Sequence, residues 1–437
     1  MDKCSDAKVS ESKGLGSVFF NLGLFQFLTF VRRGVFYTFM INYLYMLMGS
    51  VTSTAGLGTL NMFASALGQN LLWGRISDRY KVRAKLVIAG EIIAGFSYLV
   101  VFLVHRSFLD AGCDFAAGLT IILGLSILEF FWSMSDVGWA ALLTDVTTPK
   151  IRGKVTGALN FIASLGRMVG ILFAGYLYFD GEGFRSGTIF YIVTILLFVG
   201  AVVMTLASRR EDAKTKNNIV DEKQQEGNIK LYIENEKTYK WFLIALIIIV
   251  LGAASINQIF LIFLELPEGL AAKSHEMSII LASWTVGGMI ASITSGGLAD
   301  KFGKGKVLLL GLGLAIITPL FYAFANDAPL MALVYGFNGA AFWIIQTVGF
   351  VLAGDLIPEY KRGRLLSRYN TVIALSWGPA GMFIGGPFAD FQINVLKLPR
   401  NVACINAFYL SSIIVALGTI LFIAKTHSNL RRLIISQ

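Results

Sequence analysis

The sequence predicts an all-α integral membrane protein with twelve transmembrane helices in two pseudo-symmetric six-helix bundles. Three observations lead to this prediction. The 437-residue chain is 55% hydrophobic and only 15% charged, whereas a soluble domain carries roughly 25% charged residues. Apolar runs of about 20 residues, long enough to cross a bilayer, recur along it. Short charged motifs occur twice, once in each half of the chain.

The apolar runs form two sets of six, on either side of a long polar stretch at 208–240. They lie at 18–47, 54–76, 84–104, 116–145, 154–179, 188–207, 241–264, 275–299, 305–325, 328–354, 365–390 and 402–424. We therefore expect an N-terminal tail at 1–17, a first bundle at 18–207, a linker at 208–240, a second bundle at 241–424 and a C-terminal tail at 425–437. Within the linker, an amphipathic piece at Ile229–Trp241 is expected to lie along the membrane surface.

Basic residues are distributed unevenly over the loops. When the loops are assigned alternately to the two sides of the membrane, one side collects both tails, the linker and most Lys and Arg residues. The other side carries only Arg106, Arg185, Lys273, Lys397 and Arg400. Because cytoplasmic loops are enriched in Lys and Arg, we expect both termini to be cytoplasmic, in a protein of the plasma membrane. The net charge of +10 therefore requires no nucleic-acid partner.

The charged motifs indicate an internal duplication. Asp145–Asn160 reads DVTTPKIRGKVTGALN and Asp355–Asn370 reads DLIPEYKRGRLLSRYN. The acid, the Arg-Gly-basic triplet and the Asn recur at one offset. A doubled membrane segment with a charged hinge in each copy is typical of a transporter built from two bundles.

A second repeated motif follows the second helix of each half. Gly74-Arg-Ile-Ser-Asp-Arg-Tyr80 matches Gly296-Gly-Leu-Ala-Asp-Lys-Phe302. A glycine here lets a neighbouring helix approach, a carboxylate can cap a helix N-terminus, and the basic residues can reach acids on adjacent helices. We expect a latch that holds the cytoplasmic side shut. Its residues would be Gly74, Asp78, Arg79, Arg83, Asp145, Arg152, Gly296, Asp300, Lys301, Asp355 and Arg362.

The repeated loop and the twelve-helix count together resemble the major facilitator superfamily, over about 15–425. The resemblance implies transport by alternating access, with the loop Asp and Arg acting as a cytoplasmic latch. The family often has a glycine two places after the Arg. This chain has Lys81 there, whereas the second copy keeps Gly303.

Helix 5 shows a weaker resemblance to the drug:proton antiporter group. Its small residues Gly166, Gly170 and Gly175 partly match the helix 5 signature of that group. Ile171 replaces the expected proline, Arg167 interrupts the pattern, and the group's helix 4 arginine is absent. Simple packing through small residues is the alternative.

Charged residues lie deep in predicted helices of the first half. Arg32, Arg33 and Arg167 should each cost about 2.5–3.5 kcal/mol at the bilayer centre, so we expect them to face a watery cavity or a partner. Glu129 and Asp136 share one face of helix 4, and Trp132 lies beside them. A carboxylate desolvated there could hold a proton near neutral pH.

The functional interpretation is a polar site for substrate and coupling ion, formed by Arg32 or Arg33 together with Arg167, Asp136 and Glu129. Arg32 and Arg33 point about 100° apart on a helix, so we expect only one of them to face a small site. The alternative is a set of salt bridges that pins helices 1, 4 and 5 together.

The second half replaces these charges by amides and rings. At the repeat offset Asp136 corresponds to Gln346, and Arg167 to Trp377. We expect a neutral aromatic wall suited to an amphiphilic solute, with packing against lipid or helices as the alternative. Its residues would be Asn257, Gln258, Asn338, Trp343, Gln346 and Trp377.

Helix 11 is expected to bend. Pro379 and Pro387 lie within the predicted helix, among several glycines. A proline inside a helix removes a backbone hydrogen bond and permits a kink.

No reactive constellation points to an enzyme. We find no metal-ligand cluster, phosphate-binding loop or nucleophile triad in the sequence, so no cofactor and no metal is expected. Whether Cys113 and Cys404, both near the outer face, form a disulfide is left open.

Together these features favour a monomeric secondary active transporter in the lipid bilayer, which moves a small organic solute, coupled to protons. Export is favoured slightly over import. One alternative is an organic-anion uptake or exchange carrier that uses the membrane-embedded arginines. Another is a non-transporting sensor with a transporter fold.

Overall fold

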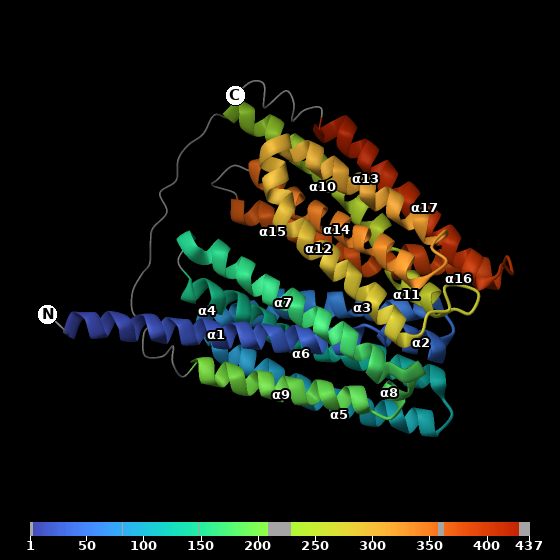
Figure 1. The fold of residues 1–437 in the computed structure, drawn as a ribbon, viewed down its shortest axis with the longest axis horizontal. Coiled ribbons are helices and arrows are strands. Elements are labelled where there is room, and N and C mark those ends of the chain that lie inside the picture. The colour runs from blue at the N-terminus through green and yellow to red at the C-terminus, as the bar shows by residue number, and fades with distance from the viewer. Residues whose placement is uncertain (1–2, 81, 148, 209–228, 357–361, 428–437) are drawn as a thin grey trace. The chain divides into compact units, whose positions relative to one another are not determined.

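The computed structural model of the chain describes residues 3–80, 82–147, 149–208, 229–356 and 362–427, and these are helical, without β-strands. Ten helices in this part are long and apolar enough to cross a membrane by length and composition. The first two expected spans, 18–47 and 54–76, are also helical but are interrupted by irregular turns. The prediction of an all-α membrane protein with two bundles of six helices is confirmed (Figure 1).

The chain divides into two compact units. Unit 1 comprises Met1–Tyr43 and Phe63–Val220, and unit 2 comprises Leu44–Met62 and Asp221–Gln437. The segment Leu44–Met62 thus belongs to the first half in sequence and to the second unit in contacts. Each unit is described by itself below.

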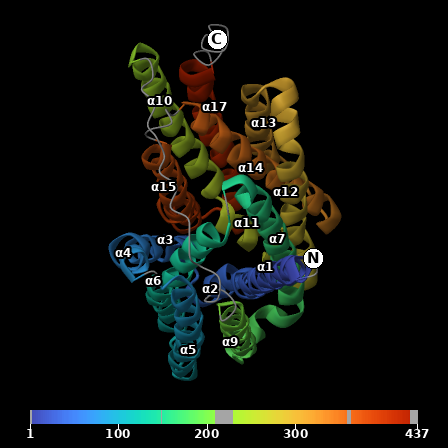
Figure 2. The ribbon, with the colours of Figure 1, turned by 90° about the vertical axis from the view of Figure 1, so that its left-hand side faces the viewer.

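In unit 1, α5 packs against α6 and α9, and α1 packs against α7 and α9 (Figure 2). The elements are α1 (Lys3–Tyr37), η1 (Gly68–Trp73), α4 (Gly74–Tyr80), α5 (Arg83–Asp110), α6 (Asp114–Val146), α7 (Pro149–Tyr178), η2 (Phe179–Gly181), α8 (Glu182–Arg185) and α9 (Thr188–Ser208). Helix α7 approaches α1 closely through Gly166, where a Cβ atom would lie 2.5 Å from the carbonyl oxygen of Phe27. The glycines of helix 5 therefore serve helix packing.

In unit 2, α13 packs against α14 and α17, α10 packs against α15 and α17, and α12 packs against α14. The elements are α10 (Ile229–Ala254), α11 (Asn257–Glu265), α12 (Ser274–Phe302), α13 (Lys304–Tyr322), α14 (Ala328–Leu356), α15 (Arg362–Ala380), η4 (Gly381–Gly385), α16 (Gly386–Asn394), α17 (Arg400–Phe422) and η5 (Ile423–His427). Two further helices, α2 (Met40–Met48) and α3 (Val51–Leu67), lie on the segments where the chain passes between units.

The two units repeat one packing pattern. The pairs α5–α6, α5–α9, α1–α7 and α1–α9 of unit 1 correspond to α13–α14, α13–α17, α10–α15 and α10–α17 of unit 2. A shared set of neighbours is what a duplicated segment predicts.

Besides helix 2, which contains the π-helical turn η1, three further spans are interrupted within the described residues. Helix 1 is broken between Tyr37 and Met40, and helix 7 is broken between Ala254 and Asn257. Helix 11 contains the π-helical turn η4 between α15 and α16, where the prolines and glycines predict bending. The piece at 229–240 is continuous with α10 rather than a separate helix.

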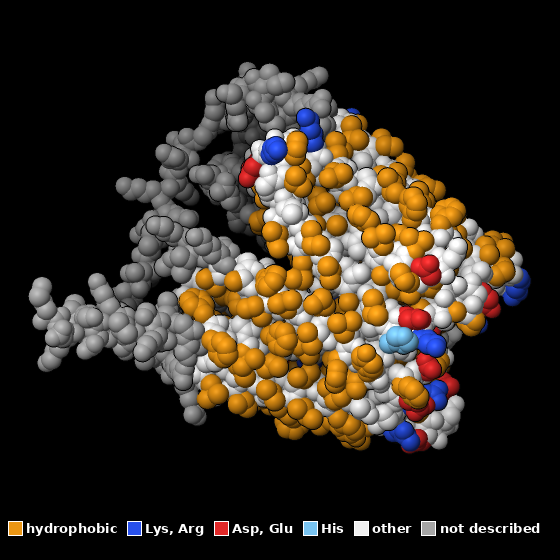
Figure 3. Space-filling model, viewed as in Figure 1, with side chains coloured by type: hydrophobic (Ala, Val, Ile, Leu, Met, Phe, Trp, Pro, Cys, Tyr) orange, Lys and Arg blue, Asp and Glu red, His pale blue; other side chains and the backbone are white. Residues whose placement is uncertain are grey.

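Hydrophobic side chains cover much of the visible surface, and charged side chains gather toward helix ends (Figure 3). Exposed large apolar residues such as Phe96, Ile195 and Ile293 occur along the spans of both units. Such a surface suits lipid rather than water as its solvent. Cys113 is exposed and Cys404 is buried, and both are free thiols.

Candidate functional site

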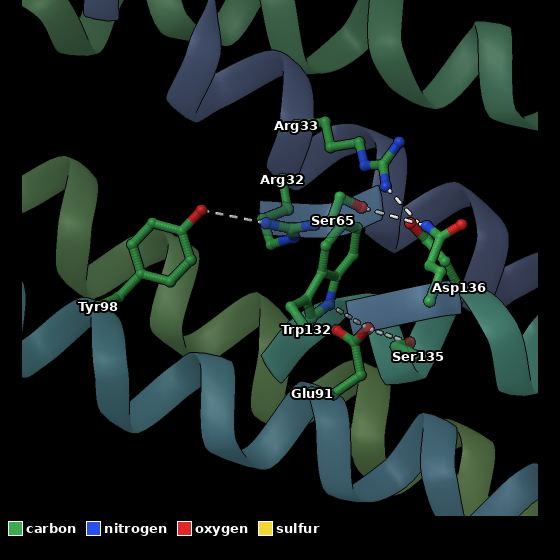
Figure 4. A network of polar contacts seen from close by, with 9 residues as sticks. Arg32, Arg33, Ser65, Glu91, Tyr98, Trp132, Ser135 and Asp136 are labelled. Atoms are coloured by element: carbon green, nitrogen blue, oxygen red, sulfur yellow. Dashed lines mark hydrogen bonds and ion pairs between the residues drawn. The ribbon is translucent and has the colours of Figure 1, made fainter. Parts of the chain in front are cut away.

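A network of polar contacts in unit 1 surrounds Trp132 on α6 (Figure 4). The indole Nε1 of Trp132 donates to Oε1 of Glu91 at 2.9 Å, and Oγ of Ser135 donates to the same oxygen at 2.9 Å. Glu91 comes from α5 and is only 1% exposed. A carboxylate so deeply buried needs such donors and a nearby positive charge.

Arg32 on α1 supplies that charge. It is 1% exposed, interacts electrostatically with Glu91, and donates from Nη1 to the hydroxyl oxygen of Tyr98 at 3.2 Å. Its guanidinium carbon lies 4.5 Å from the centre of the Trp132 ring, a cation–π contact. Arg32, Glu91 and Trp132 therefore tie α1, α5 and α6 together.

Arg33 has a different environment from its neighbour. Its Nη2 lies 3.4 Å from Oδ1 of Asp136, and the two side chains are 34% and 42% exposed. Its guanidinium carbon also lies 4.5 Å from the Trp132 ring centre. The same indole thus contacts one buried arginine and one half-exposed arginine, and the half-exposed one carries the accessible ion pair.

Glu129 completes the network on α6. Its carboxylate interacts electrostatically with Asp136, Arg33 and Arg32, and it forms a hydrogen bond with the side chain of Ser65. Nε2 of Gln69 donates to Oγ of Ser65 at 3.1 Å.

The structure thus brings together five residues that the sequence predicts, namely Arg32, Arg33, Glu129, Trp132 and Asp136. Arg167 lies on α7, which packs against α1, and its side chain is exposed.

Sequence reasoning missed Glu91, Ser65 and Tyr98. A signal for Glu91 existed, because it is an acidic residue within the apolar run 84–104, where a charge is costly. Its partners, Trp132 and Ser135 on α6, depend on how α5 packs on α6, which the sequence does not reveal.

In unit 2 the predicted residues lie in two places. Nε1 of Trp284 donates to Oδ1 of Asn338 at 3.3 Å, and Nδ2 of Asn338 donates to Oγ1 of Thr318 at 3.2 Å. The Phe342 ring centre lies 5.2 Å from that of Trp284 and 5.0 Å from that of Trp377. Trp284, which the sequence analysis did not select, thus belongs to one aromatic row with Phe342 and Trp377.

The other predicted residues of unit 2 have packing contacts. Trp343 fits against Gly288, where a Cβ atom would overlap the indole. Asn257 begins α11, and Gln258 packs against Gly381 of the π-helical turn. Gln346 is partly buried on α14.

Two acids of the expected latch, Asp145 and Asp355, each form an ion pair within their own unit. Nε of Arg83 lies 2.5 Å from Oδ2 of Asp145 in unit 1, and Nζ of Lys304 lies 2.5 Å from Oδ2 of Asp355 in unit 2. The two acids are equivalent in the repeat. The partner of Asp355 is thus Lys304, a residue left out of the expected latch.

The remaining residues of the expected latch differ in their exposure and contacts. Arg79 and Lys301 are exposed and approach the rings of their neighbours Tyr80 and Phe302. Among the described residues, a Cβ atom at Gly296 would meet nothing within 4 Å, so the expected close approach is not found there. The side chains of three predicted members lie outside the described part of the structure: Asp78, Arg152 and Arg362. Two further members, Gly74 and Asp300, lie in α4 and α12.

Comparison with known proteins identifies the family. A model described as Major Facilitator Superfamily matches residues 22–270 and 244–434. The chain belongs to this superfamily. It is a secondary transporter rather than an enzyme.

Individual relatives are distant. The chain is 23% identical over 297 residues to Multidrug resistance protein 1 of Bacillus subtilis, which covers 66% of this chain and 68% of that protein. It is 24% identical over 143 residues to the galactose-proton symporter of Escherichia coli K12, which covers 31% of this chain and 30% of the symporter.

Among solved structures, an inward-facing bacterial homologue of the human lysosomal transporter Spinster matches with a TM-score of 0.65 and 16% identity, over 94% of this chain and 95% of the other. That similarity supports the fold.

Proposed function

We propose that this transporter moves a small amphiphilic organic solute in exchange for protons, with the Trp132 network as its coupling site. The proposal depends chiefly on the Arg33–Asp136 ion pair, which is half exposed and lies beside a buried pair. Ionisable groups inside membrane helices are expensive and mark ion or substrate pathways.

Arg32 and Arg33 have different roles in this proposal. Arg32 and Glu91 are too deeply buried to meet a solute, and they hold Trp132 in place. Arg33 and Asp136 are exposed enough to exchange partners. Protonation of Asp136 would weaken its hold on Arg33, and loss of that proton would restore the pair.

Glu129 gives the site a second carboxyl group. It lies close enough to Asp136 for the two to interact, so a proton on one of them relieves repulsion with the other. The proposal therefore places proton coupling at this pair of neighbouring carboxyl groups, which can share one proton.

The aromatic row of unit 2 is our candidate for contact with the apolar part of the solute. Trp284, Phe342 and Trp377 offer ring faces, and Asn338 adds an amide held by two hydrogen bonds. Rings of this kind bind flat or hydrophobic groups.

The direction and coupling are supported by relatives only. The named multidrug resistance relative favours export, and the galactose-proton symporter favours proton coupling. We propose that both termini are cytoplasmic, because basic residues concentrate in the loops assigned to one side of the membrane. A monomer in the plasma membrane is part of the same proposal.

The latch pairs are proposed to act separately. Arg83–Asp145 joins α5 to α6 and Lys304–Asp355 joins α13 to α14, and each pair would so stiffen its own unit during transport.

An experiment on purified protein tests the coupling site. A thermal-shift screen of metabolites and drug-like cations at two pH values identifies a stabilising ligand. Counterflow of that ligand in proteoliposomes should be abolished by Asp136→Asn. The matched control is Asp110→Asn, which removes an exposed aspartate that is also paired with an arginine, Arg106.

Transport by Asp136→Asn that keeps its normal rate and its response to a pH gradient would reject the coupling site. No counterflow by the wild type with any stabilising ligand would favour the sensor alternative.

An organic-anion carrier is the second candidate. The exposed part of the Arg33 guanidinium favours it, because that group can bind a carboxylate with two parallel hydrogen bonds. In that case Arg33→Lys should raise the KM for an anionic solute, while Asp136→Asn should leave pH-independent exchange in place.

A further inference from the structure

We propose that Asp390 is a conformational lock, which fastens the N-terminus of α3 to α16 in this state and releases it during transport. This inference goes beyond the proposed function, since none of the residues involved belongs to the Trp132 network. It concerns the segment Leu44–Met62, which unit 2 holds although the chain enters it from unit 1.

Asp390 completes the cap of a helix that is more than 300 residues away in sequence. Its Oδ2 accepts hydrogen bonds from Oγ of Ser50 at 2.8 Å and from the backbone N–H of Thr52 at 2.9 Å. Its Oδ1 accepts from the N–H of Val51 at 3.0 Å. Oγ of Ser50 accepts from the N–H of Ser53 at 3.1 Å.

These bonds satisfy all three N–H groups in the first turn of α3, which have no acceptor within the helix itself. A negative charge at this end also interacts favourably with the helix dipole. Without Asp390, two of the three N–H groups would lose their acceptor.

The contact continues along α3. Oγ1 of Thr59 donates to the carbonyl oxygen of Gly378 at 3.1 Å. A Cβ atom at Gly386 would lie 2.7 Å from Cα of Thr52, and one at Gly378 would lie 2.9 Å from Cβ of Met62. Because glycine has no side chain at these positions, α15 and α16 can approach α3 closely.

The far end of the same span is anchored in unit 1. After Met62 the chain enters unit 1, and the π-helical turn η1 begins at Gly68. A Cβ atom at Gly68 would lie 2.6 Å from the carbonyl oxygen of Phe130 on α6. One continuous span therefore has an anchor in each unit.

Alternating access requires the units to move against one another. Either α3 bends between Met62 and Gly68, or one anchor opens. We assign the opening to the Asp390 anchor, because its hydrogen bonds lie at a helix end where water can replace them, and the glycine contacts at Gly378 and Gly386 would separate with it. The Gly68 anchor is backbone packing inside unit 1.

The alternative is a permanent joint, in which Leu44–Met62 travels with unit 2 through the whole cycle and α3 bends. The two possibilities differ in whether the first turns of α3 ever become accessible to reagents.

Modification of one reporter cysteine to a mixed disulfide tests the lock without a transported substrate. Thr54 is fully buried on α3. We place Thr54→Cys in a background with the native cysteines Cys4, Cys113 and Cys404 changed to serine. The rate of its modification by a membrane-impermeant methanethiosulfonate reagent is then measured in proteoliposomes.

We expect slow modification with Asp390 present, and a rate about tenfold higher with Asp390→Ala, the effect of removing an N-cap of typical strength. Asp390→Asn keeps one acceptor oxygen and should give an intermediate rate. Ser50→Ala should also raise the rate.

The matched control is Asp327→Asn. Asp327 also accepts a helix N–H, that of Leu330 at 2.8 Å, but within its own element. Asp327→Asn should leave the modification rate of Thr54→Cys unchanged. Thermal melting and gel filtration confirm that each variant is folded.

Equal modification rates for wild type, Asp390→Asn and Asp390→Ala would overturn the lock. No modification of any folded variant, with full modification in detergent-denatured protein, would show a permanent joint. Either result leaves the Trp132 network untested, so the two proposals fail separately.

Discussion

The two units share one pattern of helix packing, but different side chains occupy equivalent positions in it. Helix α6 of unit 1 carries Trp132 and Asp136, and α14 of unit 2 carries Phe342 and Gln346 at the repeat offset. In unit 1 the indole has two guanidinium neighbours and a buried carboxylate partner. In unit 2 the corresponding ring, Phe342, contacts the rings of Trp284, Trp343 and Trp377.

The comparison shows which features the duplication conserves. Both units keep the helix neighbours and the basic–acid pair at equivalent loops. The arginine–carboxylate network around Trp132 lies in unit 1, and at the repeat offset unit 2 has Phe342 and Gln346 in place of Trp132 and Asp136. Packing is therefore a property of the doubled scaffold, whereas the charged network around Trp132 belongs to unit 1.

The largest expected effect on stability is in the charged unit. Glu91→Ala leaves the buried charge of Arg32 without the carboxylate with which it interacts electrostatically, and leaving a buried charge uncompensated costs about 3–5 kcal/mol. Chemical unfolding in detergent measures the loss. The control Glu268→Gln removes an exposed carboxylate and should change stability little.

Glu91→Gln sharpens this prediction. It keeps an acceptor for Trp132 and Ser135 but removes the charge, so its loss should fall between wild type and Glu91→Ala. If Glu91→Ala unfolds no more easily than Glu268→Gln, the buried pair does not hold α1 and α5 together.

A smaller loss of stability is expected when a residue of unit 1 is replaced by its counterpart in unit 2. Trp132→Phe places in α6 the ring that α14 already has. It removes the N–H that donates to Glu91 but keeps a ring face for the arginines. Leaving a buried carboxylate with one donor fewer should cost about 1–3 kcal/mol.

The reciprocal change, Phe342→Trp, is the control. It introduces an N–H in unit 2, where the ring has aromatic neighbours. Its effect on stability should come only from the larger volume of the indole ring. Equal losses from both changes would mean that the Trp132 hydrogen bond contributes nothing beyond packing.

Much of the fold could be predicted from the sequence, because span length and charge bias are local properties. Prolines marked the irregular turn in helix 11. The breaks in helices 1 and 7 could not be predicted, since apolar residues continue through Thr38–Phe39 and Ser255–Ile256.

The candidate site was predictable where its residues share one helix face. Glu129, Trp132 and Asp136 follow helical spacing, so α6 could be identified as a carrier of the site. Glu91 and Asp390 could not be paired with their partners. Their contacts join residues 41 or more positions apart, which only the packed helices bring together.

The smallest expected effects come from the feature that both units share. Arg83→Gln and Lys304→Gln each remove one partly exposed ion pair, and such pairs contribute about 0.2–1 kcal/mol. The Arg83 side chain is 19% exposed and also donates to Oγ of Ser77 at 3.2 Å, whereas Lys304 is 35% exposed.

Arg83→Gln should therefore destabilise the protein more than Lys304→Gln, and added salt should widen the difference between the two losses, because it screens the more exposed Lys304–Asp355 pair more strongly. Unfolding at two ionic strengths measures both. A larger loss from Lys304→Gln would mean that the second copy of the motif, with its glycine retained at Gly303, carries more of the latch than the first. The asymmetry between the units would then extend to their loops.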